Sequence, residues 1–117
     1  MTDTETLKNF ILNILDDKKA ENIISLSPNT NIASCIIIAS GRSTRNIHAI
    51  AEYLSMQLKT ELHEYVKIEG SSKTEWVLLE AAEILVHLFT PSSRAYYDLE
   101  QLHTPPSTTS LTKFNAL

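Results

Sequence analysis

Glu80 and Glu83 are the residues of this chain that most resemble a catalytic pair. They flank two alanines, and two nearby carboxylates can hold Mg²⁺ or act as general acid and base. The segment around them predicts a tight turn, where such side chains normally point into solvent. A catalytic pair also needs a pocket with a nucleophile or a third ligand, and the sequence offers neither beside them. We therefore predict no catalytic residue, no metal ligand and no bound cofactor.

A second candidate for chemistry is the segment 40–45, which reads Ser-Gly-Arg-Ser-Thr-Arg. It joins an expected strand to an expected helix, where phosphate sites are often built. A Walker-type loop needs several glycines and a Lys-Ser or Lys-Thr pair, and a dinucleotide site needs three spaced glycines. With Gly41 as its single glycine, the segment better fits a turn followed by a helix cap at Ser43 or Thr44. The alternative is a nucleotidyltransferase-like enzyme with a phosphate loop near Ser43 and a metal ion on the glutamate pair.

The histidines and the single cysteine are expected to have structural roles. Cys35 lies in an apolar run and is expected to be a small buried side chain, and a lone cysteine cannot form an intrachain disulfide. His87 alternates with Leu85 and Phe89, so we expect it to be half-buried and hydrogen-bonded to backbone or to a carboxylate. Metal-ligand spacing is absent from the full set of histidines, which consists of His48, His63, His87 and His103.

The segment that begins at Trp76 alternates between two kinds of side chain. The side chains of one set suit packing under helices, and they are Val77, Leu79 and Ala81. The other set contains Trp76, Leu78 and Glu80, which place an aromatic ring and a carboxylate on one face. Aromatic and acidic groups displayed on a rigid sheet suit a basic protein partner. Ordinary core packing of the tryptophan is the competing interpretation.

Hydrophobic periodicity predicts the elements that position these residues. The first expected helix ends near residues 17–19, and the second runs from 43 or 44 to near Lys59. The third begins at Thr90-Pro91, and its apolar residues include Tyr96, Leu99 and Leu102. Thr2 and Glu5 have the spacing of a capping box at the start of the first helix. The expected strands cover 22–27, 34–40, 63–69, 76–80 and 84–89, with 34–40 central in the sheet. This order predicts an α/β fold, a single domain with a mixed, about five-stranded sheet covered by helices.

Length and composition limit the possible functions. A chain of 117 residues with 43% hydrophobic residues fits one domain, which we place at residues 1–103, followed by a disordered tail at 104–117. The net charge of −4, with ten dispersed basic residues, argues against direct nucleic-acid binding. The sequence shows neither a signal peptide nor a membrane span, which predicts a cytoplasmic protein. We expect a monomer or a weak homodimer.

A family resemblance rests on motifs that recur in a fixed order. They are Gly41-Arg42-Ser43-Thr44-Arg45, Ala49-Ile50-Ala51, Glu69-Gly70, Trp76, Val86-His87-Leu88-Phe89, Arg94, Tyr97, Leu99, Glu100 and Leu102. With them the chain resembles the ribosomal silencing factors, also called the Iojap-like family, from about Leu7 to His103. The resemblance implies a small domain with nucleotidyltransferase-like topology that lacks the catalytic carboxylate motif. It further implies a factor that binds large-subunit ribosomal protein fourteen on the intersubunit face, blocks the small subunit and lowers translation when nutrients are scarce.

The resemblance also implies which residues touch the partner. Carried onto this chain, they are Glu69, Trp76, Leu78, Glu80, Glu83, Arg94 and Tyr97. One departure concerns the hairpin tip, where relatives carry Asp-x-Gly-Asp and this chain has Glu80-Ala81-Ala82-Glu83. A left-handed residue at Ala82 costs about 1 kcal/mol more than glycine would. A domain that dimerises through the Trp76 face and has no ribosomal role is a third interpretation.

Overall fold

The computed structural model describes residues 3–27, 35–70 and 73–97. Their elements follow the predicted order and are α1 (Thr4–Asp17), β1 (Glu21–Leu26), β2 (Cys35–Ser40), α2 (Thr44–Leu62), β3 (Val66–Glu69), β4 (Trp76–Ala81), β5 (Ile84–Phe89) and α3 (Pro91–Tyr97). Helix α2 continues past the predicted end at Lys59, and β3 begins three residues after the predicted His63. The predicted tail at 104–117 lies outside the described residues.

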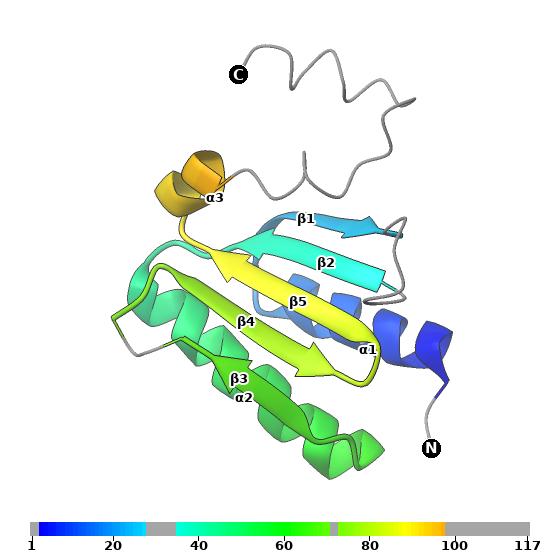
Figure 1. Ribbon diagram of the computed structural model, residues 1–117. Helices are drawn as coiled ribbons and strands as arrows, with labels where there is room; N and C mark the ends of the chain where they lie inside the picture. Colours follow the sequence, from blue (N-terminus) through cyan, green and yellow to red (C-terminus); the bar gives the residue numbers. More distant parts are fainter. Residues whose placement is uncertain (1–2, 28–34, 71–72, 98–117) are drawn as a thin grey trace.

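The five strands form one mixed sheet in the order β1-β2-β5-β4-β3 (Figure 1). Strands β2 and β5 are parallel, while the other neighbouring pairs are antiparallel. The predicted α/β fold class is thereby confirmed. Strand β2 is buried along its whole length, as its run of isoleucines predicts, and it lies inside the sheet between β1 and β5, with β5 at the centre.

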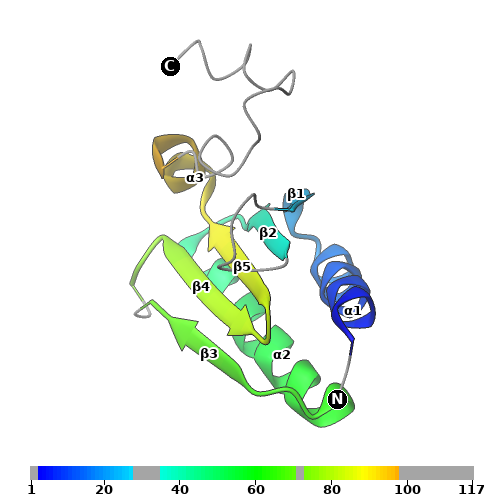
Figure 2. The ribbon, with the colours of Figure 1, turned by 45° about the vertical axis from the view of Figure 1, so that its right-hand side comes forward.

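Helices α1 and α2 lie side by side against the same face of the sheet (Figures 1 and 2). Each presents one buried apolar stripe, which is Leu7, Ile11 and Leu15 in α1 and Ile47, Ile50, Ala51, Leu54 and Leu58 in α2. On β4 the side chains that join this core are Val77, Leu79 and Ala81, as the alternation predicts. None of the helices in the described ranges has both the length and the apolar character that a bilayer-spanning segment needs.

Helix α3 lies beyond the end of β5, apart from α1 and α2 (Figures 1 and 2). It begins at Pro91, as predicted, because proline suits the first helical position. Tyr96, which was predicted among the apolar residues of this helix, is 81% exposed. The helix contacts the end of the sheet through Ser93, which is buried. Leu99 and Leu102, the other apolar residues predicted for this helix, lie outside the described residues.

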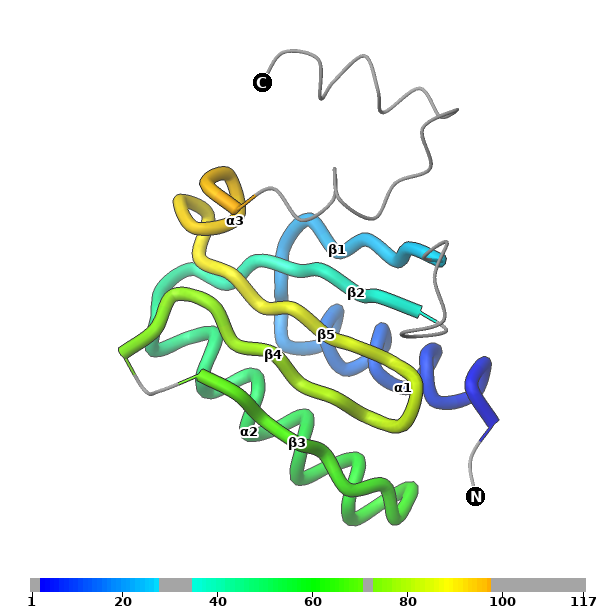
Figure 3. The backbone as a smooth tube through the Cα atoms, in the orientation of Figure 1, coloured from blue at the N-terminus to red at the C-terminus, as the bar shows by residue number. Residues whose placement is uncertain are grey.

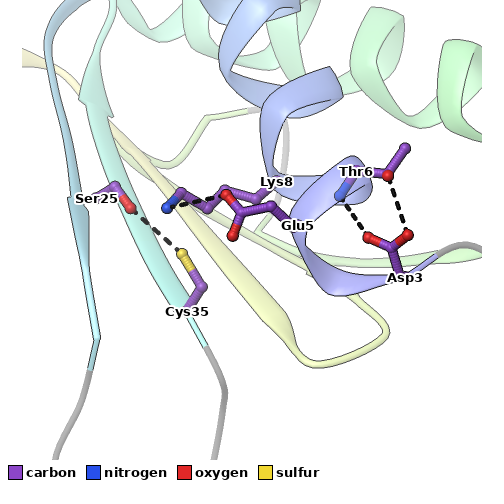
Figure 4. A network of polar contacts seen from close by, with 6 residues as sticks. All are labelled: Asp3, Glu5, Thr6, Lys8, Ser25 and Cys35. Carbon is purple, nitrogen blue, oxygen red and sulfur yellow. Dashed lines mark hydrogen bonds and ion pairs between the residues drawn. The ribbon is translucent and has the colours of Figure 1, made fainter.

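Side chains cap the first turn of α1 and α2. Asp3 is the N-cap of α1, and its carboxylate accepts hydrogen bonds from Thr6 N at 2.8 Å and from Thr6 Oγ1 at 3.1 Å (Figure 4). The predicted capping box from Thr2 to Glu5 was therefore misplaced by one residue, and Glu5 pairs with Lys8 instead. Figure 4 also shows the buried Cys35, whose Sγ lies 3.4 Å from Ser25 Oγ across β1 and β2.

Candidate protein-docking surface

The sheet face opposite α1 and α2 carries the tryptophan, and we call it the tryptophan face. Strand register determines which side chains are neighbours on it, because directly opposite residues share a face. Trp76 lies opposite Phe89, and Leu78 lies opposite His87 on one side and Glu69 on the other. The residues of β3, β4 and β5 that line this face are Lys67, Glu69, Trp76, Leu78, Glu80, Leu85, His87 and Phe89.

The indole of Trp76 is half-buried in an aromatic cluster on this face. Its ring centroid lies 5.1 Å from that of Phe89, in a stacked arrangement, and 4.6 Å from that of Tyr97 on α3. Trp76 packs against the second, smaller group of buried apolar residues, which is separate from the core under the helices. The indole therefore lies where an approaching protein can reach it, which is what an anchor residue of a docking surface requires.

His87 lies beside the indole and holds it through a hydrogen bond. Trp76 Nε1 donates to His87 Nδ1 at 3.0 Å. His87 is 6% exposed, so it is more buried than predicted. The indole is a hydrogen-bond partner that the sequence did not predict. A directional contact thus fixes the tryptophan ring in addition to its packing.

Hydrogen bonds around Glu75 attach α3 to the start of β4. The Glu75 carboxylate accepts from Thr90 Oγ1 at 2.8 Å and from Ser92 Oγ at 3.1 Å. Its backbone oxygen accepts from Ser93 Oγ at 2.6 Å and from Thr90 N at 3.1 Å. Because these bonds involve the first turn of α3, they place Tyr97, one turn further along, against Trp76. A hollow of about 540 Å³ lies between this helix and the start of β4.

Arg94, a predicted contact residue, is partly engaged inside the fold. Its Nη1 donates a 2.9 Å hydrogen bond to Ser40 Oγ at the end of β2, and its side chain is half-buried. Tyr97, the other predicted residue of this helix, is 46% exposed. Of the two, Tyr97 offers more surface to a partner, whereas Arg94 ties α3 to the sheet.

A second hollow of about 240 Å³ lies beside the tryptophan, lined by Glu69, Gly70, Trp76 and Leu78. Gly70 has φ of +127°, a conformation that favours glycine. A Cβ at this position would also lie 2.9 Å from the backbone oxygen of Trp76. Glycine here therefore allows β3 to end close to β4, with the exposed carboxylate of Glu69 next to the indole.

The two remaining predicted contact residues, Glu80 and Glu83, lie close to the hairpin between β4 and β5. Glu80 lies on the tryptophan face, 4.0 Å from Lys67 Nζ, whereas Glu83 is exposed in the tight turn between β4 and β5 (Figure 3). At about 3.3 Å per residue, that turn is roughly 17 Å along β4 from Trp76. Ala82 in the turn has φ of 52°, so the left-handed conformation considered from the sequence is present. The structure thus gathers Glu69, Trp76, Leu78, Arg94 and Tyr97 toward the start of β4. Glu80 and Glu83 lie toward the hairpin turn at the other end of that strand.

Phe89, His87 and Glu75 belong to the site but were not predicted as part of it. A signal for the first two was available in the sequence. With a two-residue turn at 82–83, the register of β4 on β5 follows, and it places Phe89 opposite Trp76. Glu75 gave no comparable signal, because its role depends on where α3 packs.

The candidate phosphate loop is used to begin α2. Ser43 is the N-cap, and its Oγ accepts from Asn46 N at 3.0 Å. The Asn46 side chain in turn accepts from Arg42 N at 3.0 Å. A Cβ on Gly41 would lie 2.6 Å from Ile47, so glycine here allows close packing of strand and helix. Within the described ranges, His, Cys, Asp and Glu side chains do not gather in groups of three or more that could hold a metal ion.

The model of one protein family, described as "Ribosomal silencing factor during starvation", matches residues 1–116. The chain belongs to the ribosomal silencing factor family. A relative named "Ribosomal silencing factor RsfS" from Zymomonas mobilis is 40% identical over 102 residues, which are 86% of this chain and 77% of the relative. Another of the same name, from Halalkalibacterium halodurans, is 35% identical and covers 87% of this chain and 88% of its own length.

Two solved structures share the fold of this chain. A crystal structure of a protein from Chromobacterium violaceum aligns with a TM-score of 0.76 at 30% identity and covers 92% of this chain and 93% of its own. A crystal structure from Bacillus halodurans gives a TM-score of 0.73 at 32% identity, with coverage of 85% and 94%. A mouse relative, "Mitochondrial assembly of ribosomal large subunit protein 1", is 33% identical over 80% of this chain and 43% of its own length. The family resemblance inferred from the motifs is confirmed.

Proposed function

We propose that this silencing factor binds large-subunit ribosomal protein fourteen through the tryptophan face. Bound on the intersubunit face, it blocks the joining of the small and large subunits and represses translation when nutrients are limiting. The family's description refers to silencing of ribosomes during starvation, and the name of the mouse relative refers to the large subunit. Both support a ribosomal partner.

The observation that carries the proposal is the anchored, half-buried indole with the carboxylate of Glu69 beside it. A standard docking patch covers roughly 800 Å² per partner, and a few aromatic anchors supply most of its binding energy. Trp76 stacks on Phe89 and donates a hydrogen bond to His87, so its side chain has little conformational freedom to lose on binding. Glu69, which lines a hollow together with Trp76, and Glu80, further along β4 on the same face, suit the lysines and arginines of a ribosomal protein.

The proposed mechanism is exclusion by occupancy and not catalysis. The Ser43 hydroxyl is engaged in capping α2, and Glu80 lies beside Lys67, so neither is arranged for phosphate chemistry. The net charge of −4 favours contact with a basic protein over direct contact with ribosomal RNA. The bacterial relatives that carry the silencing-factor name support a cytoplasmic location.

Sedimentation tests the proposal directly. Purified large and small subunits are mixed with and without the protein and separated on a sucrose gradient. We expect the protein to travel with the large subunit and the joined ribosomes to decrease. Sedimentation of the protein at the top of the gradient, with joined ribosomes unchanged, would contradict the proposal. Light scattering of the free protein tests whether the tryptophan face instead pairs two copies of the chain.

A substitution of Trp76 tests the anchor. We expect Trp76→Ala to weaken binding to protein fourteen by about 2 kcal/mol or more, which is tens-fold in affinity. Met56→Ala is the matched control, because Met56 is 53% exposed and lies on α2, on the other side of the sheet. Binding is measured by calorimetry, with circular dichroism as the check on folding. A folded Trp76→Ala protein with wild-type affinity would refute the role of the indole.

A further inference from the structure

The hydrogen bond between Trp76 and His87 fixes the protonation state of the histidine. Trp76 Nε1 lies 3.0 Å from His87 Nδ1, and an indole N–H can only donate. His87 Nδ1 must therefore present a lone pair, which requires a neutral imidazole with its proton on Nε2. The doubly protonated ring has an N–H at both positions, so it cannot accept from the indole.

This hydrogen bond sets the orientation of the indole. The contacts of Trp76 with Phe89 and Tyr97 are ring contacts with centroids at 5.1 and 4.6 Å. Ring contacts of this kind tolerate several orientations, whereas a hydrogen bond weakens steeply with angle. When the acceptor is lost, only packing remains, and packing does not select one rotation of the ring about its side-chain bonds.

Apolar residues lie directly across from His87 on both neighbouring strands, namely Ile38 on β2 and Leu78 on β4. The charged groups of the tryptophan face are farther away in the register. Glu69 of β3 is one strand beyond Leu78, and Glu80 of β4 lies opposite Leu85, in the next row of the sheet. From α3, Arg94 donates to Ser40 Oγ, and Tyr97 contacts the rings of Trp76 and Phe89.

We propose that His87 is a positioning residue for the docking surface, and that protonation of its imidazole releases Trp76 from the binding orientation. This inference rests on the proposed docking function. Protonation places a hydrogen on Nδ1, which then faces the indole N–H, so the bond breaks and the ring turns away. Binding to the large subunit therefore weakens as the pH falls through the range in which His87 takes up a proton.

The lone tryptophan lets the free protein report this change without any partner. The fluorescence emission of Trp76 is recorded between about pH 5.5 and pH 8, because histidine is the side chain whose ordinary pKa lies in this range. We expect one transition in the wild-type protein. His87→Asn should abolish it, because Oδ1 of asparagine occupies the place of Nδ1 and accepts but does not titrate. His63→Asn is the control, since His63 is exposed and its φ of 56° suits asparagine.

The binding measurement uses the same variants with purified large subunits at about pH 8 and about pH 5.5. Loss of one hydrogen bond corresponds to a decrease in affinity of about three- to tenfold. We expect that decrease in the wild-type protein at the lower pH and no decrease in His87→Asn. His87→Leu, which has a similar shape and no acceptor, should bind more weakly than His87→Asn at both pH values.

Because His87 is buried, a measurement on the unaltered chain complements the variants. Nitrogen NMR of the imidazole at about pH 8 should show the Nε2–H tautomer, and Trp76→Phe should remove that preference. A wild-type pH effect that persists unchanged in His87→Asn, or a neutral ring protonated on Nδ1, would overturn the inference. Absence of wild-type binding at both pH values would overturn the proposed docking instead, and the fluorescence and NMR results would still decide the Trp76–His87 pair.

Discussion

At the tip of the β4–β5 hairpin, Ala82 adopts a backbone conformation that favours glycine. Its φ of 52° lies in the left-handed region, where the Cβ of an L-residue meets the following carbonyl oxygen. Glycine would remove that contact but would also have more freedom in the unfolded chain, so the two effects partly cancel. We expect Ala82→Gly to raise the free energy of unfolding by about 0.5–1 kcal/mol, measured from urea unfolding curves.

Ala49 provides the control for this substitution. It is exposed in the middle of α2, where alanine is the best helix former and glycine costs about 1 kcal/mol. The same chemical change should therefore stabilise the protein at position 82 and destabilise it at position 49. Destabilisation at both positions would show that the turn does not strain Ala82.

At the scale of elements, the start of α2 distinguishes a helix cap from a phosphate loop. Aspartate caps a helix about as well as serine, and its charge suits the positive end of the helix dipole. We expect Ser43→Asp to keep the wild-type stability and Ser43→Ala to lose about 1 kcal/mol. Titration with ATP and Mg²⁺ should show no saturable tight binding to either protein or to the wild type. Tight ATP binding that Ser43→Asp abolishes would favour the enzyme interpretation.

The start of α1 predicts a specific dependence of stability on pH. Hydrogen bonds from the backbone and side chain of Thr6 hold the pKa of the Asp3 carboxyl below its ordinary value. A lowered pKa in the folded state stabilises the protein above the unfolded pKa, and the effect is lost as the pH falls through the folded one. The wild type should therefore have a higher melting temperature than Asp3→Ala at neutral pH, and the difference should shrink below about pH 4.

Asp3→Asn is the control for this effect, because asparagine caps as well as aspartate but does not titrate. Its melting temperature should exceed that of Asp3→Ala by an amount that does not vary with pH. Contributions from the other carboxylates cancel, because they are common to all three proteins. A wild-type advantage over Asp3→Ala that stays constant down to about pH 2 would show that the Asp3 cap contributes no pH dependence.

Elements whose apolar pattern reflects burial could be predicted from the sequence. Features that depend on tertiary contacts could not. Strand β5 was predicted to the residue, because its apolar run is bounded by turn residues on both sides. The predicted start of β3 was wrong because His63 takes the left-handed conformation that caps α2, outside the extended region of a regular strand. The exposure of Tyr96 depends on where α3 packs, and the periodicity of the helix does not contain that information.

The same distinction applies to the site. Alternation along β4 was sufficient to place Trp76 and Leu78 on the face away from the helices. Alternation describes one strand at a time, so it did not show that His87 accepts from the indole. That contact needed the register between two strands, which the length of the turn at 82–83 sets.

At the scale of the whole molecule, the sheet separates folding from binding. The face under α1 and α2 holds the larger cluster of buried side chains, including Leu79 and Val86 at 0% exposure. The tryptophan face holds a smaller cluster and the partly exposed residues. Substitutions of exposed residues on the tryptophan face should therefore change binding with little effect on stability. Charge changes on the two sides of the sheet can then show whether the location of a charge or the net charge of the molecule matters for binding.

Glu69 and Glu61 allow that test, because both are exposed and lie on opposite sides of the sheet. Glu69→Lys and Glu61→Lys change the net charge of −4 by the same amount. Exposed charges at the rim of an interface act mainly on the association rate, and salt screens them over about 8–10 Å. We expect Glu69→Lys to slow association with the large subunit several-fold at low salt, and Glu61→Lys to slow it much less.

In stopped-flow measurements the association rates of the two variants should converge as salt rises. Their dissociation rates should stay similar, since the anchoring contacts of Trp76 are unchanged. Equal slowing by the two substitutions would mean that total charge governs the encounter, and that the tryptophan face has no special part in steering it.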